Sequence, residues 1–101
     1  MTFPSMAPAK TAYSEPWALV LYGGADPTKR PSTRLAWITE AIAIRGHIVG
    51  YRAYTWSQSA HGWTKKVRRF EESEILYSWR SKPTEHDIQR IRKRLKPGLV
   101  A

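Results

Sequence analysis

Cationic side chains are the most abundant groups in this sequence that could bind a ligand. Lysine and arginine number 17 against eight aspartate and glutamate residues, which gives the 101-residue chain a formal net charge of +9. A net charge of this size attracts polyanions, although it does not specify a fold. We therefore expect an acidic partner, with nucleic acid, either RNA or DNA, as the first candidate.

The cations gather in three parts of the sequence. Residues 47–70 hold five cations and no acid, residues 83–101 have a net charge of +3, and a third group lies in and after the loop 23–32. The residues that we expect to contact phosphate groups are Lys29, Arg30, Arg34, Arg52, Lys65, Lys66, Arg68, Arg69, Arg90, Arg92, Lys93, Arg94 and Lys96. With no base-reading motif beside them, they predict binding mainly through the phosphate backbone.

A β-hairpin is expected to display the first group. Strand alternation over residues 63–70 would send Lys65 and Arg69 to one face, and Lys66 and Arg68 to the other. Tyr54 and Trp56 would then lie near Lys65 across the ladder and could stack on bases. In the alternative interpretation, these aromatic rings face the core and the cations are simply solvated.

The other two groups depend on helix ends. The loop GGADPTKRPS follows a strand and precedes an expected helix, whose free N–H groups would bind an anion beside Lys29, Arg30 and Arg34. It lacks the GxxxxGK[ST] spacing of a P-loop. In the last helix, cations occupy every side except a narrow apolar seam, and the helix dipole is a structural reason for part of that pattern.

Catalytic and metal-binding patterns are weak. The absence of cysteine excludes disulfides, a thiolate zinc site and a cysteine nucleophile. His47, His61 and His86 have no helical metal-pair spacing, and no nucleophile–base pair can be argued from the sequence. We expect no cofactor, no metal and no enzymatic activity. A metal-independent ribonuclease using His61 is the remaining catalytic alternative.

A protein partner is the main alternative to nucleic acid. Five tryptophans and five tyrosines accompany the arginines, and these residue types dominate the energetics of protein interfaces. A small inhibitor or accessory subunit, of anti-CRISPR-like size, would bind an acidic surface. No apolar run approaches the ~18 residues of a membrane span, and residues 1–10 do not form a secretory signal. We expect a cytoplasmic protein without membrane contacts, of undetermined oligomeric state.

The elements that must position these residues predict an α+β fold. Strands are expected at residues 17–22, 47–56, 63–70 and 75–80, and helices at residues 33–45 and from residue 84 to about 96. The order β-α-β-β-β-α predicts a small antiparallel or mixed sheet of about four strands with two helices. Residues 1–16, with three prolines, are expected to form a flexible arm, and residues 17–101 one basic domain.

The two helices are predicted from spacing and caps. Arg45 followed by Gly46 is typical of a helix end, and Thr84 with Asp87 is a variant of the capping box. The expected core is Leu19, Leu21, Leu35, Ile38, Ile42, Ile88, Ile91 and Leu95. The order of elements over residues 33–96 resembles double-stranded-RNA-binding domains in topology alone. The lysine motif that opens the last helix of that family is not matched by residues 82–87.

Overall fold

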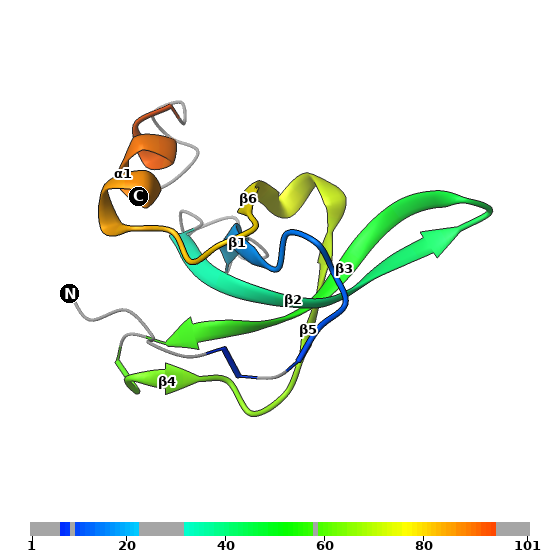
Figure 1. Ribbon diagram of the computed structural model, residues 1–101, viewed down its shortest axis with the longest axis horizontal. Helices are drawn as coiled ribbons and strands as arrows, with labels where there is room; N and C mark the ends of the chain where they lie inside the picture. The colour runs from blue at the N-terminus through cyan, green and yellow to red at the C-terminus, as the bar shows by residue number, and fades with distance from the viewer. Residues whose placement is uncertain (1–6, 9, 23–31, 58, 95–101) are drawn as a thin grey trace, which may run out of the picture.

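Antiparallel strands make up most of the fold. The computed structural model describes residues 7–8, 10–22, 32–57 and 59–94 (Figure 1). Its strands are β1 (Trp17–Tyr22), β2 (Ser32–Ile44), β3 (His47–Ser57), β4 (Gly62–Trp63), β5 (Arg68–Glu71) and β6 (Ile75–Trp79). A short 3₁₀ helix, η1 (Glu72–Glu74), precedes β6, and the α-helix α1 (Glu85–Arg94) follows it.

The strands form one curved sheet in the order β4-β3-β2-β1-β6. The strand β5 also pairs with β3, so β4 and β5 lie one after the other along the same edge. Every pairing is antiparallel. The long strands β2 and β3 curve outward together, and their connecting turn projects beyond the rest of the described chain (Figure 1).

The helix expected at residues 33–45 is wrong, because this segment is β2. Two features explain the error. Four consecutive residues, Leu35 to Ile38, are buried, since β2 has core on both of its faces, and such a run also fits helical spacing. Arg45 (φ 52°) and Gly46 (φ 81°) are not a helix end but the two central residues of a tight hairpin turn, which requires positive φ at both positions.

The fold class must be corrected accordingly. The described residues form a six-stranded antiparallel sheet with one α-helix, not about four strands with two helices. One further strand is β2, which replaces the expected helix, and the other arises because the expected strand 63–70 is interrupted and becomes β4 and β5. The topological resemblance to double-stranded-RNA-binding domains is lost with the first helix.

Two apolar cores lie on opposite faces of the sheet. The helix-side core contains Trp17, Leu19, Leu35, Trp37, Ile88 and Ile91. The β5-side core contains Ala18, Val20, Ala36, Ile38, Ala53 and Phe70. Alternate residues of β1 and β2 therefore face different cores. Of the expected core, Leu19, Leu35, Ile38, Ile88 and Ile91 are buried, Leu21 and Ile42 are half-buried, and Leu95 lies outside the described residues.

The predicted capping box of α1 is confirmed. The Asp87 amide donates to the Thr84 hydroxyl (3.1 Å), and the Thr84 amide donates to the Asp87 carboxylate (3.0 Å). The backbone and the hydroxyl of Thr84 lower the pKa of Asp87. Because the cap fixes where the helix starts, Ile88 and Ile91 both face the helix-side core.

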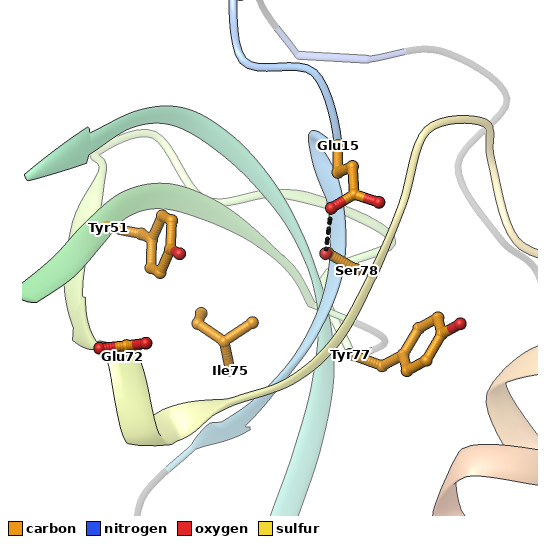
Figure 2. Close-up of a pocket in the computed structure, with 6 residues that line it drawn as sticks. All are labelled: Glu15, Tyr51, Glu72, Ile75, Tyr77 and Ser78. Atoms are coloured by element: carbon orange, nitrogen blue, oxygen red, sulfur yellow. Dashed lines mark hydrogen bonds between the residues drawn. The ribbon is translucent and has the colours of Figure 1, made fainter. Parts of the chain in front are cut away.

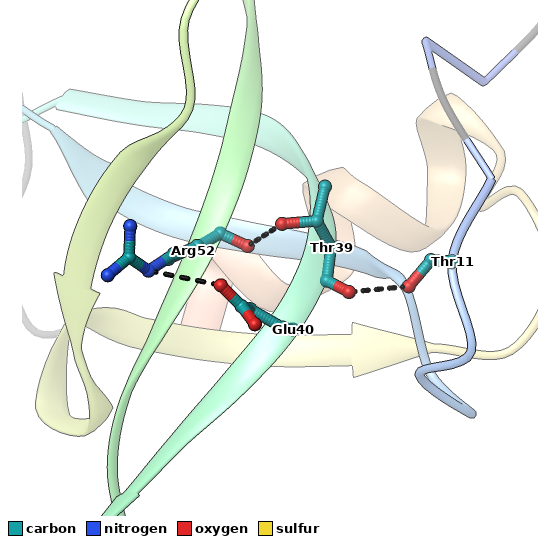
Figure 3. A network of polar contacts seen from close by, with 4 residues as sticks. All are labelled: Thr11, Thr39, Glu40 and Arg52. Atoms are coloured by element: carbon teal, nitrogen blue, oxygen red, sulfur yellow. Dashed lines mark hydrogen bonds and ion pairs between the residues drawn. The ribbon is translucent and has the colours of Figure 1, made fainter.

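The segment 10–16 lies against the sheet. The Thr11 hydroxyl donates to the carbonyl oxygen of Thr39 (3.0 Å; Figure 3), and the Ile38 amide donates to the carbonyl oxygen of Pro16 (2.7 Å). The ring of Tyr13 meets the ring of Tyr51 edge-on, with 5.6 Å between centroids. These contacts bring the segment beside the β5-side core.

We expect Tyr13 to make the fold sensitive to alkali. Burial, followed by the hydrogen bond with Tyr51, raises the pKa of Tyr13 from 10.0 to about 12. Because the folded state favours the neutral phenol, the contribution of Tyr13 to the free energy of unfolding is fully present below pH 10. It is lost as the pH rises toward 12. Urea denaturation at pH 9 and pH 11.5 should therefore show a smaller loss of stability for Tyr13→Phe than for the wild type. The exposed Tyr77→Phe variant is the control, and equal losses in all three proteins would contradict the expectation.

Candidate nucleic-acid interface

The basic edge, defined here as Lys65, Lys66, Arg68 and Arg69, follows the outer side of β3 but is not a continuous strand. Trp56 pairs with Trp63 in β4, and Ala53 pairs with Arg68 in β5, while residues 64–67 belong to neither strand. The expected alternation from Lys65 to Arg69 is therefore wrong, because the ladder is interrupted between β4 and β5. All four cationic side chains are exposed.

Thr64 holds the interrupted segment against β3. Its amide donates to the carbonyl oxygen of the buried Thr55 (2.9 Å), and its hydroxyl accepts the Thr55 amide (3.1 Å). The same hydroxyl donates to the carbonyl oxygen of Lys66 (3.2 Å). Thr64 thus fixes the backbone from which Lys65 and Lys66 extend. Sequence reasoning missed this residue, since nothing in the local pattern distinguishes it from a solvated threonine.

Replacing Thr64 by valine is expected to destabilise the protein by about 1–3 kcal/mol, because the buried Thr55 amide would lose its acceptor. The matched variant Thr64→Ser keeps the hydroxyl and should retain most of the stability. Urea denaturation of the two variants measures the difference. A Thr64→Val protein as stable as Thr64→Ser would show that the hydroxyl does not hold the segment.

Two arginines converge on one tyrosine beside the basic edge. The guanidinium carbon of Arg34 (β2) lies 3.8 Å from the ring centroid of Tyr22 (β1), and that of Arg68 (β5) lies 4.6 Å from it. Arg68 also lies 5.6 Å from the ring centroid of Phe70. Neither arginine has an ion-pair partner within the described ranges. The aromatic ring therefore holds two like charges close together, and no carboxylate from the described residues pairs with either of them.

Arg52 and Arg69 face each other across the β3–β5 pair, but each has an acidic partner. The Nε atom of Arg52 lies 3.1 Å from a carboxylate oxygen of Glu40 (Figure 3), and that of Arg69 lies 3.6 Å from Glu71. More than half of each of these side chains is exposed, so the two ion pairs are weak and open to competition from another anion. Among the described residues, Lys65 and Lys66 have no such pair.

The cations of α1 are of two kinds: two have polar partners within the protein, and two are exposed at the end of the helix. Arg92 donates from Nε to the Thr33 hydroxyl (2.7 Å), and burial lowers the pKa of its guanidinium. Arg90 lies 3.8 Å from Asp87. Lys93 and Arg94 are exposed at the end of the helix. Arg92 is thus mainly a link between α1 and β2, a role that the charge pattern did not reveal.

Tyr54 and Trp56 pack against the helix-side core. Trp56 meets Trp63 edge-on, with 5.6 Å between ring centroids. This geometry matches the alternative in which the hairpin aromatics serve the core, so we leave both residues out of the interface. Lys29, Arg30 and Lys96 lie outside the described residues, and Arg34 lies in β2 instead of the first turn of a helix.

Metal-binding and membrane-spanning features were also sought in the described part of the chain. It contains no group of three or more histidine, aspartate or glutamate side chains placed to hold a metal ion. His47, His61 and His86 are each exposed. No helix within the described ranges has both the length and the apolar character needed to cross a membrane.

Comparison with known proteins gives no relative. No family model matches the sequence, and no curated protein and no solved structure matches the chain. The residues of the interface are therefore chosen from their own geometry and charge.

Proposed function

We propose that this protein binds nucleic acid through its phosphate backbone. The observation that carries the proposal is the pair Arg34 and Arg68 on Tyr22, which places two guanidinium groups together without an acidic partner among the described residues. Guanidinium groups bind phosphate through paired N–H donors in a fixed geometry. A phosphate that accepts from both groups would remove the repulsion between them.

The spacing of the two guanidinium groups suits one phosphate. Their carbons lie at most 8.4 Å apart, which is the sum of their distances from the Tyr22 centroid. A phosphorus atom lies about 4 Å from a guanidinium carbon when the N–H···O distances are about 2.8 Å. We propose that one phosphate beside the Tyr22 ring accepts hydrogen bonds from both groups.

The basic edge extends this site along the chain. Lys65 and Lys66 precede Arg68 and are exposed, and they offer charges for neighbouring phosphates. The exposed ion pairs of Arg52 and Arg69 can exchange their carboxylates for phosphates at small cost. Because each neutralised phosphate releases condensed counterions, the affinity should fall steeply with salt.

The double variant Lys65→Gln/Lys66→Gln tests this extension. Each lost phosphate contact is expected to make the slope of log K against log salt shallower by about 0.9 on duplex DNA. The matched control is Arg80→Gln/Lys82→Gln, which removes the same charge from two exposed residues outside the proposed interface. Fluorescence anisotropy with a labelled duplex over a salt series measures both slopes. Equal slopes for the two variants would remove Lys65 and Lys66 from the interface.

A second candidate function, binding to a protein, is favoured by the projecting turn between β2 and β3. The side chains of Ile44 (56% exposed) and Ile48 (42% exposed) lie there without apolar cover. Exposed isoleucines on a projection can fill an apolar pocket of a partner, while the basic residues steer association with an acidic surface. A partner that binds the wild type but not Ile44→Ser/Ile48→Ser would support this function.

A further inference from the structure

A groove of about 400 Å³ lies on the side of the molecule where η1 and β6 meet the segment 10–16. Its lining residues are Glu15, Tyr51, Glu72, Ile75, Tyr77 and Ser78 (Figure 2). No lysine or arginine is among them, although the chain has a net charge of +9. Two carboxylates thus share this groove, and none of the described residues that line it is a cation.

Of the three glutamates in residues 71–74, Glu72 is the one whose side chain has no polar partner in the described part of the chain. Its neighbour Glu71 pairs with Arg69, and Glu74 accepts the backbone amide of Glu71 in the cap of η1. The carboxylate of Glu72 has no hydrogen bond or ion pair among the described residues. Figure 2 shows its carboxylate on η1, on the same side of the groove as Tyr51 and Ile75.

Glu15 approaches the groove from the other side. One of its carboxylate oxygens accepts the Ser78 hydroxyl (3.2 Å; Figure 2), and this bond fixes the side chain at the wall of the groove. The second oxygen is left to accept from a ligand. Because Glu15 comes from the N-terminal segment and Glu72 from η1, the fold alone brings these two charges to one groove.

The space between the carboxylates is partly apolar. The side chain of Ile75, the first residue of β6, lies between Tyr51 and Ser78, and the Tyr51 hydroxyl points toward the same space (Figure 2). The ring of Tyr13 meets that of Tyr51 edge-on, with 5.6 Å between centroids, and supports it from outside the groove lining. The Tyr77 ring is directed away from the carboxylates and lies at the outer rim (Figure 2).

We propose that this groove binds a primary alkylammonium group, as carried by a lysine side chain or a polyamine. The ammonium group carries a positive charge and three N–H donors, and the groove offers oxygen acceptors on Glu15, Glu72 and Tyr51. Its alkyl chain matches the apolar wall at Ile75. Calcium and magnesium ions prefer a shell made of oxygen ligands alone, so the isoleucine wall favours an organic cation.

This site is independent of the proposed nucleic-acid interface. It uses carboxylates to bind a cation, whereas the basic edge uses cations to bind an anion. Failure of either proposal leaves the other standing.

The test is an NMR titration of the full chain with n-butylammonium, and n-butanol is the uncharged probe. We expect shifts of the backbone amides of residues 15, 51, 72 and 75 with butylammonium, and at least about tenfold weaker binding of butanol. Glu15→Gln/Glu72→Gln, which keeps the shape of the half-buried Glu15 and the exposed Glu72 side chains, should weaken butylammonium binding at least about tenfold. Glu85→Gln on α1 is the matched control and should bind like the wild type.

The relative affinities of two further ligands distinguish a polyamine from a lysine side chain as the source of the ammonium group. Tighter binding of spermidine than of Nα-acetyl-lysine methylamide indicates a polyamine, and the reverse order indicates a lysine side chain. Shifts spread over all acidic residues, or an equal loss of binding in the Glu85→Gln control, would overturn the proposal. A Glu15→Gln/Glu72→Gln protein that keeps its spectral dispersion and binds butylammonium as tightly as the wild type would also overturn it.

Discussion

Replacing Arg34 and Arg68 together by glutamine is expected to weaken binding to nucleic acid about 100-fold. Each guanidinium would lose hydrogen bonds to a charged phosphate, which contribute about 1.5–3 kcal/mol. At the lower end of this range, two such losses amount to about 3 kcal/mol and correspond to about two orders of magnitude in the dissociation constant. Fluorescence anisotropy at one fixed, low salt concentration measures the change.

The control for this prediction separates local contacts from net charge. Arg80→Gln/Lys82→Gln removes the same two charges outside the interface, so its effect should be limited to a few-fold loss through the long-range field. Tyr22→Phe keeps the ring under both guanidinium groups and should bind like the wild type. If the Arg34/Arg68 and Arg80/Lys82 double variants lost affinity equally, the arginine pair would not be the site.

Replacing Phe70 by alanine is expected to cost about 3–5 kcal/mol of the free energy of unfolding. Phe70 is 0% exposed and is the largest of the fully buried side chains, and it anchors β5 in the β5-side core. The backbone of Phe70 also lies close to β3, because a Cβ atom on Gly50 would lie 2.6 Å from the carbonyl oxygen of Phe70. Since domains are stable by about 5–15 kcal/mol, this variant should be close to unfolding.

Urea denaturation tests the Phe70 prediction against two controls. Phe70→Leu keeps most of the apolar volume and should lose less than half as much stability. The partly exposed Val67→Ala should change stability by about 0.5 kcal/mol or less. A Phe70→Ala loss as small as that of Val67→Ala would show that β5 is not anchored through this ring.

The parts of the fold that sequence patterns predicted are those that depend on local chemistry. The strand at His47–Ser57 was expected from its β-branched and aromatic residues, and the cap at Thr84 from its spacing to Asp87. The segment 33–45 was wrongly predicted as a helix, because this strand packs against a core on each of its two faces. A strand between two cores shows neither strict alternation nor a polar side, so its apolar residues also fit a helix.

The candidate site was predicted only in part, for a related reason. The cations of the basic edge are visible in the sequence as a run without acids. The convergence of Arg34 and Arg68 on Tyr22 is not visible, because it depends on which strands pair and in which register. The same holds for Arg92, whose bond to Thr33 spans 59 residues. Charge counts therefore identified candidate ligands of phosphate, while the pairing of strands decided which of them lie together.

The central claim is that the partner is nucleic acid held by phosphate contacts, and the salt dependence of binding tests it most directly. Affinity of the wild-type chain for a labelled duplex and a labelled single strand should be measured from 50 to about 200 mM salt. With four to six cations in contact, we predict a slope of log K against log salt of roughly −4 to −5 on duplex DNA. No detectable retention on either DNA or RNA at the lowest salt, together with a tight complex with a folded protein, would contradict it.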